Sequence, residues 1–179
     1  MIKKGKVQVY TGNGKGKTTA AIGQVLRILA YGGKVCIIQF FKPEQIGEIH
    51  LLKKSFPKQV KVYGICRNHP FFLSKKTKQD PKKIKIECIE QWQKTKEKAF
   101  KKKYDLIVFD EINIAFRDGF IPLKDFFEFL RQKPQSQEWI LTGRGAPPQI
   151  IREAALVTEM KEVKHPFRKS LKARKGIEY

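Results

Sequence analysis

The sequence has no long hydrophobic run and only a few cysteines. No apolar run approaches the roughly 18 residues of a membrane-spanning helix, so we expect no membrane segment. The chain starts Met-Ile-Lys-Lys-Gly-Lys and passes at once into a strand-like segment, without the apolar region of a signal peptide. Its three cysteines, Cys36, Cys66 and Cys88, lie 30 and 22 positions apart, a spacing that offers neither a metal knuckle nor a paired disulfide framework. These absences predict a reduced, cytoplasmic protein.

Acidic residues are scarce as well. The 179 residues include 38 Lys and Arg but only 17 Asp and Glu, which gives a formal net charge of +21. The excess is concentrated in residues 53–103, with 17 basic and 4 acidic side chains. Such a surface is either merely solvated or suited to an anionic partner, which is a nucleic acid or a polyanionic small molecule. Charge alone does not decide between them.

Apolar strands alternate with amphipathic helices along the chain. Hydrophobic residues make up 41% of the sequence, enough for a core, and the length suits a single domain over residues 1–179. Strands that are apolar throughout are typical of parallel sheets buried on both faces. The pattern predicts an α/β fold with a three-layer, mostly parallel sheet. The expected strands are 7–10, 34–41, 60–65, 106–109, 139–142 and 156–163, and the expected helices are 22–29, 81–101, 123–130 and 147–155.

A glycine-rich turn follows the first strand. Residues 11–19 read Thr-Gly-Asn-Gly-Lys-Gly-Lys-Thr-Thr and match the Walker A pattern except at Thr11, where the pattern has glycine. The glycines let successive backbone N–H groups surround a phosphate at the start of a helix. Lys17 can neutralise phosphate charge, and the Thr18 hydroxyl can bind Mg²⁺. The loop predicts a nucleotide site with Mg²⁺.

Two acids, Asp110 and Glu111, directly follow the apolar strand 106–109. Open α/β folds bind ligands at the carboxyl edge of the sheet, so either carboxylate suits a metal opposite Thr18. Glu111 also suits the activation of a hydroxyl or a water, which leaves hydrolysis open. Arg144 follows another strand at the same edge, where it either reaches a phosphate or is an ordinary loop arginine. The sequence contains no recognisable Ser-His-Asp or Cys-His catalytic set.

The motifs together resemble one enzyme family. Residues 11–21 are similar to the phosphate loop of the P-loop corrinoid adenosyltransferases, some of which also have threonine at the first Walker position. Further similar segments are Gln39-Phe40 with Lys42, Gly47-Glu48, residues 108–111, residues 141–145, and the tail 163–179. The resemblance implies a RecA-like P-loop NTPase fold. It also implies transfer of the 5′-deoxyadenosyl group of ATP to the Co(I) of a corrinoid, with release of triphosphate, in adenosylcobalamin formation.

The resemblance also implies roles for individual residues. Lys17, Thr18 and Glu111 would be catalytic, and Thr18 and Glu111, with Asp110, would hold Mg²⁺. The corrinoid loop of the family often reads Gly-Phe-x-Trp, whereas this chain has Pro-Phe-Phe-Leu at 70–73, so Phe71 or Phe72 would face the corrinoid. The residues expected to bind ATP are Gly12, Asn13, Gly14, Lys15, Gly16, Lys17, Thr18, Thr19 and Arg27.

The resemblance further implies partners. Because Co(I) is itself a strong nucleophile, no general base is required, but a flavoprotein or another reductant must supply it. Members of the family are usually homodimers. The N-terminal extension that covers the nucleotide in some members is not expected here, because the first strand starts at Val7.

One alternative is a RecA-like ATPase that binds nucleic acid. The net charge and the lysine-rich helix 81–103 favour it, but the sequence has no recognisable nucleic-acid recognition module and no second motor domain. A small nucleoside kinase is a third reading, for which lid and acceptor-site signals are not apparent. We therefore expect the adenosyltransferase, with no nucleic-acid partner.

Overall fold

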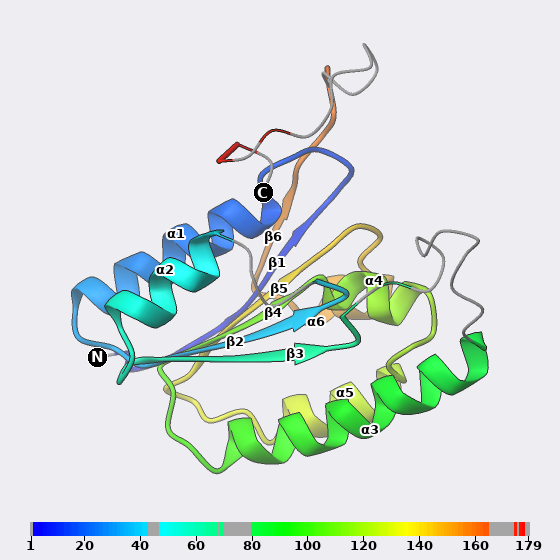
Figure 1. Ribbon diagram of the computed structural model, residues 1–179, viewed down its shortest axis with the longest axis horizontal. Helices are drawn as coiled ribbons and strands as arrows, with labels where there is room; N and C mark the ends of the chain where they lie inside the picture. Colours follow the sequence, from blue (N-terminus) through cyan, green and yellow to red (C-terminus); the bar gives the residue numbers. More distant parts are fainter. Residues whose placement is uncertain are drawn as a thin grey trace.

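The computed structural model in Figure 1 describes residues 2–42, 47–67, 69, 80–164, 174 and 176–177. The strands are β1 (Val7–Thr11), β2 (Val35–Phe40), β3 (Val60–Ile65), β4 (Leu106–Asp110), β5 (Glu138–Thr142) and β6 (Leu156–Glu159). The helices are α1 (Lys17–Ala30), α2 (Gly47–Ser55), α3 (Pro81–Phe100), α4 (Ile112–Arg117), α5 (Leu123–Arg131) and α6 (Pro148–Glu153).

Within these residues the strands form one six-stranded sheet in the order β3-β2-β4-β5-β1-β6. Every neighbouring pair is parallel, as predicted. Strand β5 lies between β1, which leads into the glycine-rich turn, and β4, which ends in Asp110. The carboxyl ends of β1, β4 and β5 therefore meet at one edge of the sheet, where the predicted site residues lie.

Two apolar clusters cover the two faces of the sheet. In β4 all five residues are buried and alternate between the faces, because successive side chains of a strand point in opposite directions. Val108 belongs to the same cluster as Val25 of α1 and the buried side chains of α2, whereas Phe109 packs with Trp92 of α3 and Phe126 of α5. Figure 1 shows α1 and α2 on one side of the sheet and α3 and α5 on the other. The predicted three-layer α/β architecture is confirmed.

The sequence pattern missed two helices. Helix α2 buries only Ile49 and Leu52, too few apolar positions to make a clear helical period. Helix α4 has only six residues and is separated from β4 by Glu111 alone, so it is too short to show a helical period of its own. The last strand is shorter than predicted, since β6 ends at Glu159 rather than at residue 163. In the described ranges no helix has the length and apolar character needed to cross a membrane.

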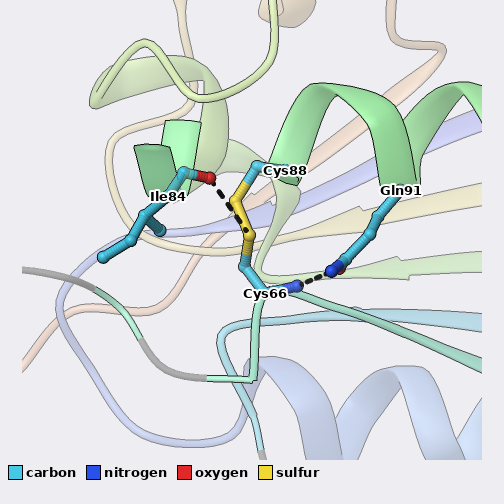
Figure 2. Close-up of a disulfide and its surroundings, with 4 residues drawn as sticks. All are labelled: Cys66, Ile84, Cys88 and Gln91. Carbon is cyan, nitrogen blue, oxygen red and sulfur yellow. Dashed lines mark hydrogen bonds between the residues drawn. A yellow bond between two sulfur atoms is a disulfide. The ribbon is translucent and has the colours of Figure 1, made fainter. Parts of the chain in front are cut away.

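A disulfide corrects the prediction made from cysteine spacing. Cys66, which follows β3, is bonded to Cys88 in α3, with their Cα atoms 5.6 Å apart (Figure 2). The Cys66 N–H donates a hydrogen bond to Gln91 Oε1 on the same helix (2.8 Å). Spacing along the chain does not report this pair, because it depends on how α3 packs against the sheet. The prediction of reduced cysteines therefore holds only for Cys36, a buried free thiol whose pKa is raised by burial.

Candidate active site

The glycine-rich turn between β1 and α1 is held against the chain that follows β6. The Gly14 N–H donates to the Met160 carbonyl oxygen (2.6 Å), and a Cβ at position 14 would lie 2.7 Å from that oxygen. Gly16 caps α1 with φ of 116°, a left-handed conformation that glycine adopts at little cost. The turn is therefore a fixed loop at a helix N-terminus, and its backbone shape depends on these glycines.

Lys17, the first residue of α1, is buried beneath the loop. Its ammonium donates hydrogen bonds to the carbonyl oxygens of Gly12 (2.8 Å) and Gly14 (2.6 Å). Burial lowers the pKa of Lys17, and the nearby charges of Arg144 and Lys42 act in the same direction, whereas Glu111 opposes them. An anion in the loop would meet this ammonium and the helix N-terminus together.

A cavity of about 690 Å³ opens above the loop. It brings together the phosphate loop, the Glu111 carboxyl from the end of β4 and Arg144 from the end of β5, three parts of the chain that are far apart in sequence. Its lining consists of Asn13, Gly14, Lys15, Gly16, Lys17, Thr18, Thr19, Ile22, Lys42, Gly47, Glu48, Glu111, Arg144, Gly176 and Ile177.

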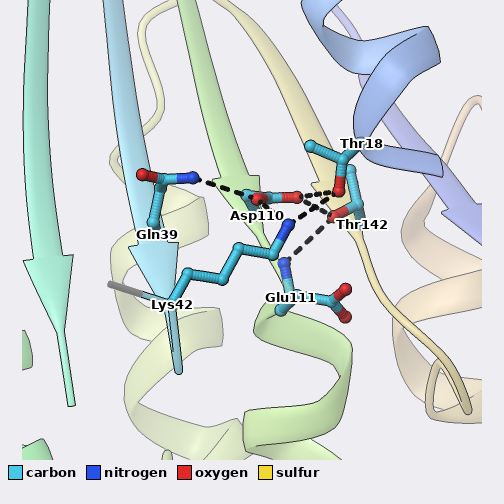
Figure 3. A network of polar contacts seen from close by, with 6 residues as sticks. All are labelled: Thr18, Gln39, Lys42, Asp110, Glu111 and Thr142. Carbon is cyan, nitrogen blue, oxygen red and sulfur yellow. Dashed lines mark hydrogen bonds and ion pairs between the residues drawn. The ribbon is translucent and has the colours of Figure 1, made fainter. Parts of the chain in front are cut away.

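Asp110 is the centre of a polar network at the edge of the sheet (Figure 3). Its Oδ1 accepts hydrogen bonds from the hydroxyls of Thr18 (2.8 Å) and Thr142 (2.7 Å). Its Oδ2 accepts from Lys42 Nζ (2.7 Å) and Gln39 Nε2 (3.3 Å). Burial opposes ionisation of Asp110, but the Lys42 charge and these hydrogen bonds outweigh it and hold the pKa below the ordinary value. Asp110 is therefore a buried, ionised carboxylate that faces the first turn of α1.

The Glu111 carboxyl has different surroundings from that of its neighbour Asp110. Its backbone is left-handed (φ 65°), and its N–H donates to Thr142 Oγ1 (3.0 Å), so its side chain turns to the cavity. Burial raises the pKa of Glu111, the Asp110 charge raises it further, and the cations Lys42, Lys17 and Arg144 oppose both. Within the described part of the chain, Glu111 Oε2 is buried without a hydrogen-bond partner. A buried carboxylate oxygen without a partner is costly, and a cation bound beside it would lower that cost.

The structure gathers the predicted site residues that it describes, except Arg27. Residues 13–19 and Glu111 line the cavity, Gly12 contacts Lys17, and Asp110 contacts Thr18. Arg27 is an exposed residue about 15 Å further along α1 and does not line the cavity, so its nucleotide contact stays a prediction. Phe71 and Phe72 lie outside the described residues.

Sequence reasoning placed Thr18 opposite the strand-end acids, but it did not predict the other three partners of Asp110. Gln39 lies near the carboxyl end of β2, Lys42 follows that strand, and Thr142 ends β5. Both strands pair with β4, so these side chains meet the Asp110 carboxylate from either side. The sequence feature that could have indicated these partners is a polar residue at or just after the end of an apolar strand. This feature identifies a partner of Asp110 only once the strand order is known.

A phosphate loop, a buried lysine and a strand-end carboxylate bonded to the loop threonine define a P-loop nucleotide-binding protein. The family model described as ATP:corrinoid adenosyltransferase BtuR/CobO/CobP matches residues 3–179. The chain therefore belongs to this family. It is an adenosyltransferase that acts on ATP and a corrinoid.

Relatives match over almost the full chain. A corrinoid adenosyltransferase from Sinorhizobium sp. is 35% identical over 179 residues, covering 99% of this chain and 81% of that protein. The corrinoid adenosyltransferase of Escherichia coli and the corrinoid adenosyltransferase CobA of Salmonella typhimurium are each 33% identical over 178 residues, covering 99% of this chain and 87% of theirs. The structure also superposes on the Hef helicase domain of Pyrococcus furiosus with a TM-score of 0.46 and 18% identity, covering 96% of this chain and 38% of that one. Family membership confirms the predicted adenosyltransferase activity. It does not support the alternative prediction, a RecA-like ATPase that binds nucleic acid.

Proposed function

We propose that the cavity above residues 12–19 holds the triphosphate of ATP and directs its C5′ atom to the Co(I) of the corrinoid. One observation carries the proposal. The loop, its buried lysine and the Glu111 carboxyl face one cavity of about 690 Å³. Backbone N–H groups and a helix N-terminus stabilise phosphate charge without rearrangement. The residues proposed to bind ATP are Gly12, Asn13, Gly14, Lys15, Gly16, Lys17, Thr18 and Thr19.

In the reaction, the Co–C5′ bond forms while the bond from C5′ to the triphosphate oxygen breaks. The cobalt supplies the electron pair, so no protein base has to remove a proton. What remains for the protein is to orient the reactants and to stabilise the charge that grows on the leaving triphosphate. Lys17 is placed for the second task, because its ammonium lies at the centre of the loop.

Thr18, Asp110 and Glu111 fit a magnesium ion. Mg²⁺ prefers hard oxygen ligands, and P-loop enzymes use the loop Ser or Thr with a strand-end carboxylate. Here the Thr18 hydroxyl and the Asp110 carboxylate contact each other, and both already contact a cation, the Lys42 ammonium. Glu111 adds a buried oxygen without a partner among the described residues. When bound, the ion would offset part of the triphosphate charge.

Substitution of Lys17 tests the proposal. We expect Lys17→Ala to lower kcat/KM by about 10²-fold or more, because it removes stabilisation of the leaving group. Lys94→Ala, at an exposed position of α3, is the control and should leave the rate unchanged. The assay combines chemically reduced cobalamin with Mg·ATP under anaerobic conditions and measures a light-sensitive Co–C product and stoichiometric triphosphate. Release of ADP and orthophosphate without alkylation would contradict the proposed chemistry, and a normal rate in Lys17→Ala would contradict the role of this lysine.

Further parts of the function are proposed on the family resemblance. Phe71 and Phe72 are proposed to contact the corrinoid, and Arg27 the nucleotide. A flavoprotein or a similar donor would reduce the cobalt, and the whole chain, residues 1–179, would act as one domain of a homodimer. Strand β6 at the sheet edge exposes all four of its residues, which suits a surface covered by a second copy. Light scattering measures the oligomeric state.

We place the enzyme in the cytoplasm, where ATP is made. The Cys66–Cys88 disulfide is compatible with this compartment because both cysteines are buried, at 8% and 0% exposure, and burial limits attack by cellular thiols. Fractionation of cells that express the native chain tests the location.

A further inference from the structure

The Lys42 ammonium contacts the same two oxygens that suit a divalent metal ion. Its Nζ lies 2.9 Å from Thr18 Oγ1 and 2.7 Å from Asp110 Oδ2 (Figure 3). Lys42 lies two residues after β2, while Thr18 is in α1 and Asp110 ends β4. Three separate elements therefore converge on one cation position.

Asp110 depends on this cation. Its side chain is only 2% exposed, and its ion pair with Lys42 is the one salt bridge found for it among the described residues. A buried carboxylate is costly unless it is paired and hydrogen-bonded. The remaining partners of Asp110, which are Thr18, Thr142 and Gln39, are neutral donors. They satisfy its lone pairs but do not balance its charge.

A metal ion that binds these oxygens would lie beside the Lys42 ammonium. Two cations at contact distance repel each other strongly where water does not screen them. The Lys42 ammonium also already contacts Thr18 Oγ1 and Asp110 Oδ2, two of the oxygens that the metal ion would need. The metal ion and the Lys42 ammonium therefore exclude each other at this position.

We propose that Lys42 holds the metal position of the site and yields it only when the triphosphate arrives together with the metal. The inference rests on the magnesium site proposed above. The Lys42 side chain lines the cavity and is 23% exposed, so its ammonium has access to the space that we assign to the phosphates. Displaced from Asp110, it gains phosphate oxygens as new partners. Metal binding and ATP binding are thereby coupled, and each strengthens the other to the same extent.

The test measures binding of Mn²⁺ without nucleotide, by electron paramagnetic resonance of the free ion. We expect Lys42→Met to bind Mn²⁺ at least about tenfold more tightly than the wild type, a change of about 1.4 kcal/mol. Lys42→Arg keeps the cation and should resemble the wild type. Arg144→Met is the matched control, because it removes the same charge from the same cavity but leaves the Lys42–Asp110 ion pair intact. Adding Asp110→Asn to Lys42→Met should abolish the gain.

Removing Lys42 leaves Asp110 unpaired and is expected to lower stability. Lys42→Gln, which keeps a hydrogen-bond donor, is the second variant and should also gain Mn²⁺ affinity. For both variants, Mn²⁺ should raise the melting temperature more than it does for the wild type. Equal Mn²⁺ affinity in the wild type and the two neutral variants would overturn the inference. An equal gain in Mn²⁺ affinity in Arg144→Met would also overturn the inference, because loss of any positive charge from the cavity would then explain the effect.

A second measurement separates this inference from the magnesium site itself. Mn²⁺ is added to the wild type with ATP, and an increase in the water proton relaxation rate above that of Mn·ATP without protein reports the ternary complex. If that complex forms but the Lys42 variants gain nothing without ATP, only the role of Lys42 is wrong. If Asp110→Asn and Glu111→Gln leave the ternary complex unaffected, the proposed metal site is wrong as well.

Discussion

The Cys66–Cys88 disulfide makes a quantitative prediction about stability. It links residues 22 positions apart, between the end of β3 and helix α3. In the chain-entropy model, closing a loop of this length restricts the unfolded chain by about 3.4 kcal/mol at 25 °C. We therefore expect the double variant Cys66→Ala/Cys88→Ala to lose about 3 kcal/mol of unfolding free energy. At about 2–4 °C per kcal/mol for a domain of this size, the melting temperature should fall by about 6–12 °C.

Urea unfolding followed by tryptophan fluorescence measures this difference. Before the comparison, alkylation in urea without reductant should modify one thiol of the oxidised wild type, that of Cys36. A phosphine reductant should bring the wild type close to the double variant and leave the double variant unchanged. The reasoning fails if the double variant loses less than about 1 kcal/mol, well below the loop-closure value. It also fails if all three cysteines of the oxidised protein react.

Two further predictions concern the site. Burial opposes the ionisation of Asp110, but the Lys42 charge keeps the pKa of this carboxyl below its ordinary 3.8. The stabilisation that ionised Asp110 provides is therefore complete above pH 3.8 and is lost as the pH falls through the lower folded-state pKa. Asp110→Asn should remove this acid-sensitive part from urea unfolding curves measured between about pH 6 and pH 2, and parallel curves for variant and wild type would contradict the assignment. Gly14→Ala should cost roughly 1–3 kcal/mol and weaken ATP binding measured by calorimetry, because its Cβ meets the Met160 carbonyl at 2.7 Å. Gly23→Ala, with nothing within 4 Å, is its control and should be neutral or stabilising; an equal loss in both would show that loop packing is not the cause.

Most of the fold was predictable because its signals are local. The strand at 106–109 is apolar throughout and the helix over 81–101 is periodic, and both appear in the structure within one residue at each end. Helices α2 and α4 were missed because their few buried residues acquire meaning only through contact with the sheet. Local pattern thus determines elements that carry enough apolar residues to define a period.

The site residues likewise include some that local sequence predicts and some that it does not. Residues 11–19 form a phosphate loop that is recognisable from sequence, since one short segment supplies the glycines, the lysine and the threonine. Its acidic counterpart Asp110 was recognised as a strand-end acid opposite Thr18, because P-loop enzymes share that arrangement. Its ion pair with Lys42 was not recognised, because it depends on the pairing of β2 with β4. The disulfide was missed because it depends on how α3 packs against the sheet.

By itself, the sequence determined the alternation of strands and helices, the phosphate loop and the resemblance to the corrinoid adenosyltransferases. These features depend on neighbouring residues, whose spacing is visible in the chain. Only the tertiary structure decided that Lys42 contacts both Thr18 and Asp110, that Glu111 faces the cavity, and that Cys66 meets Cys88. Contacts of this kind depend on strand order and helix packing, which bring together side chains from distant parts of the chain.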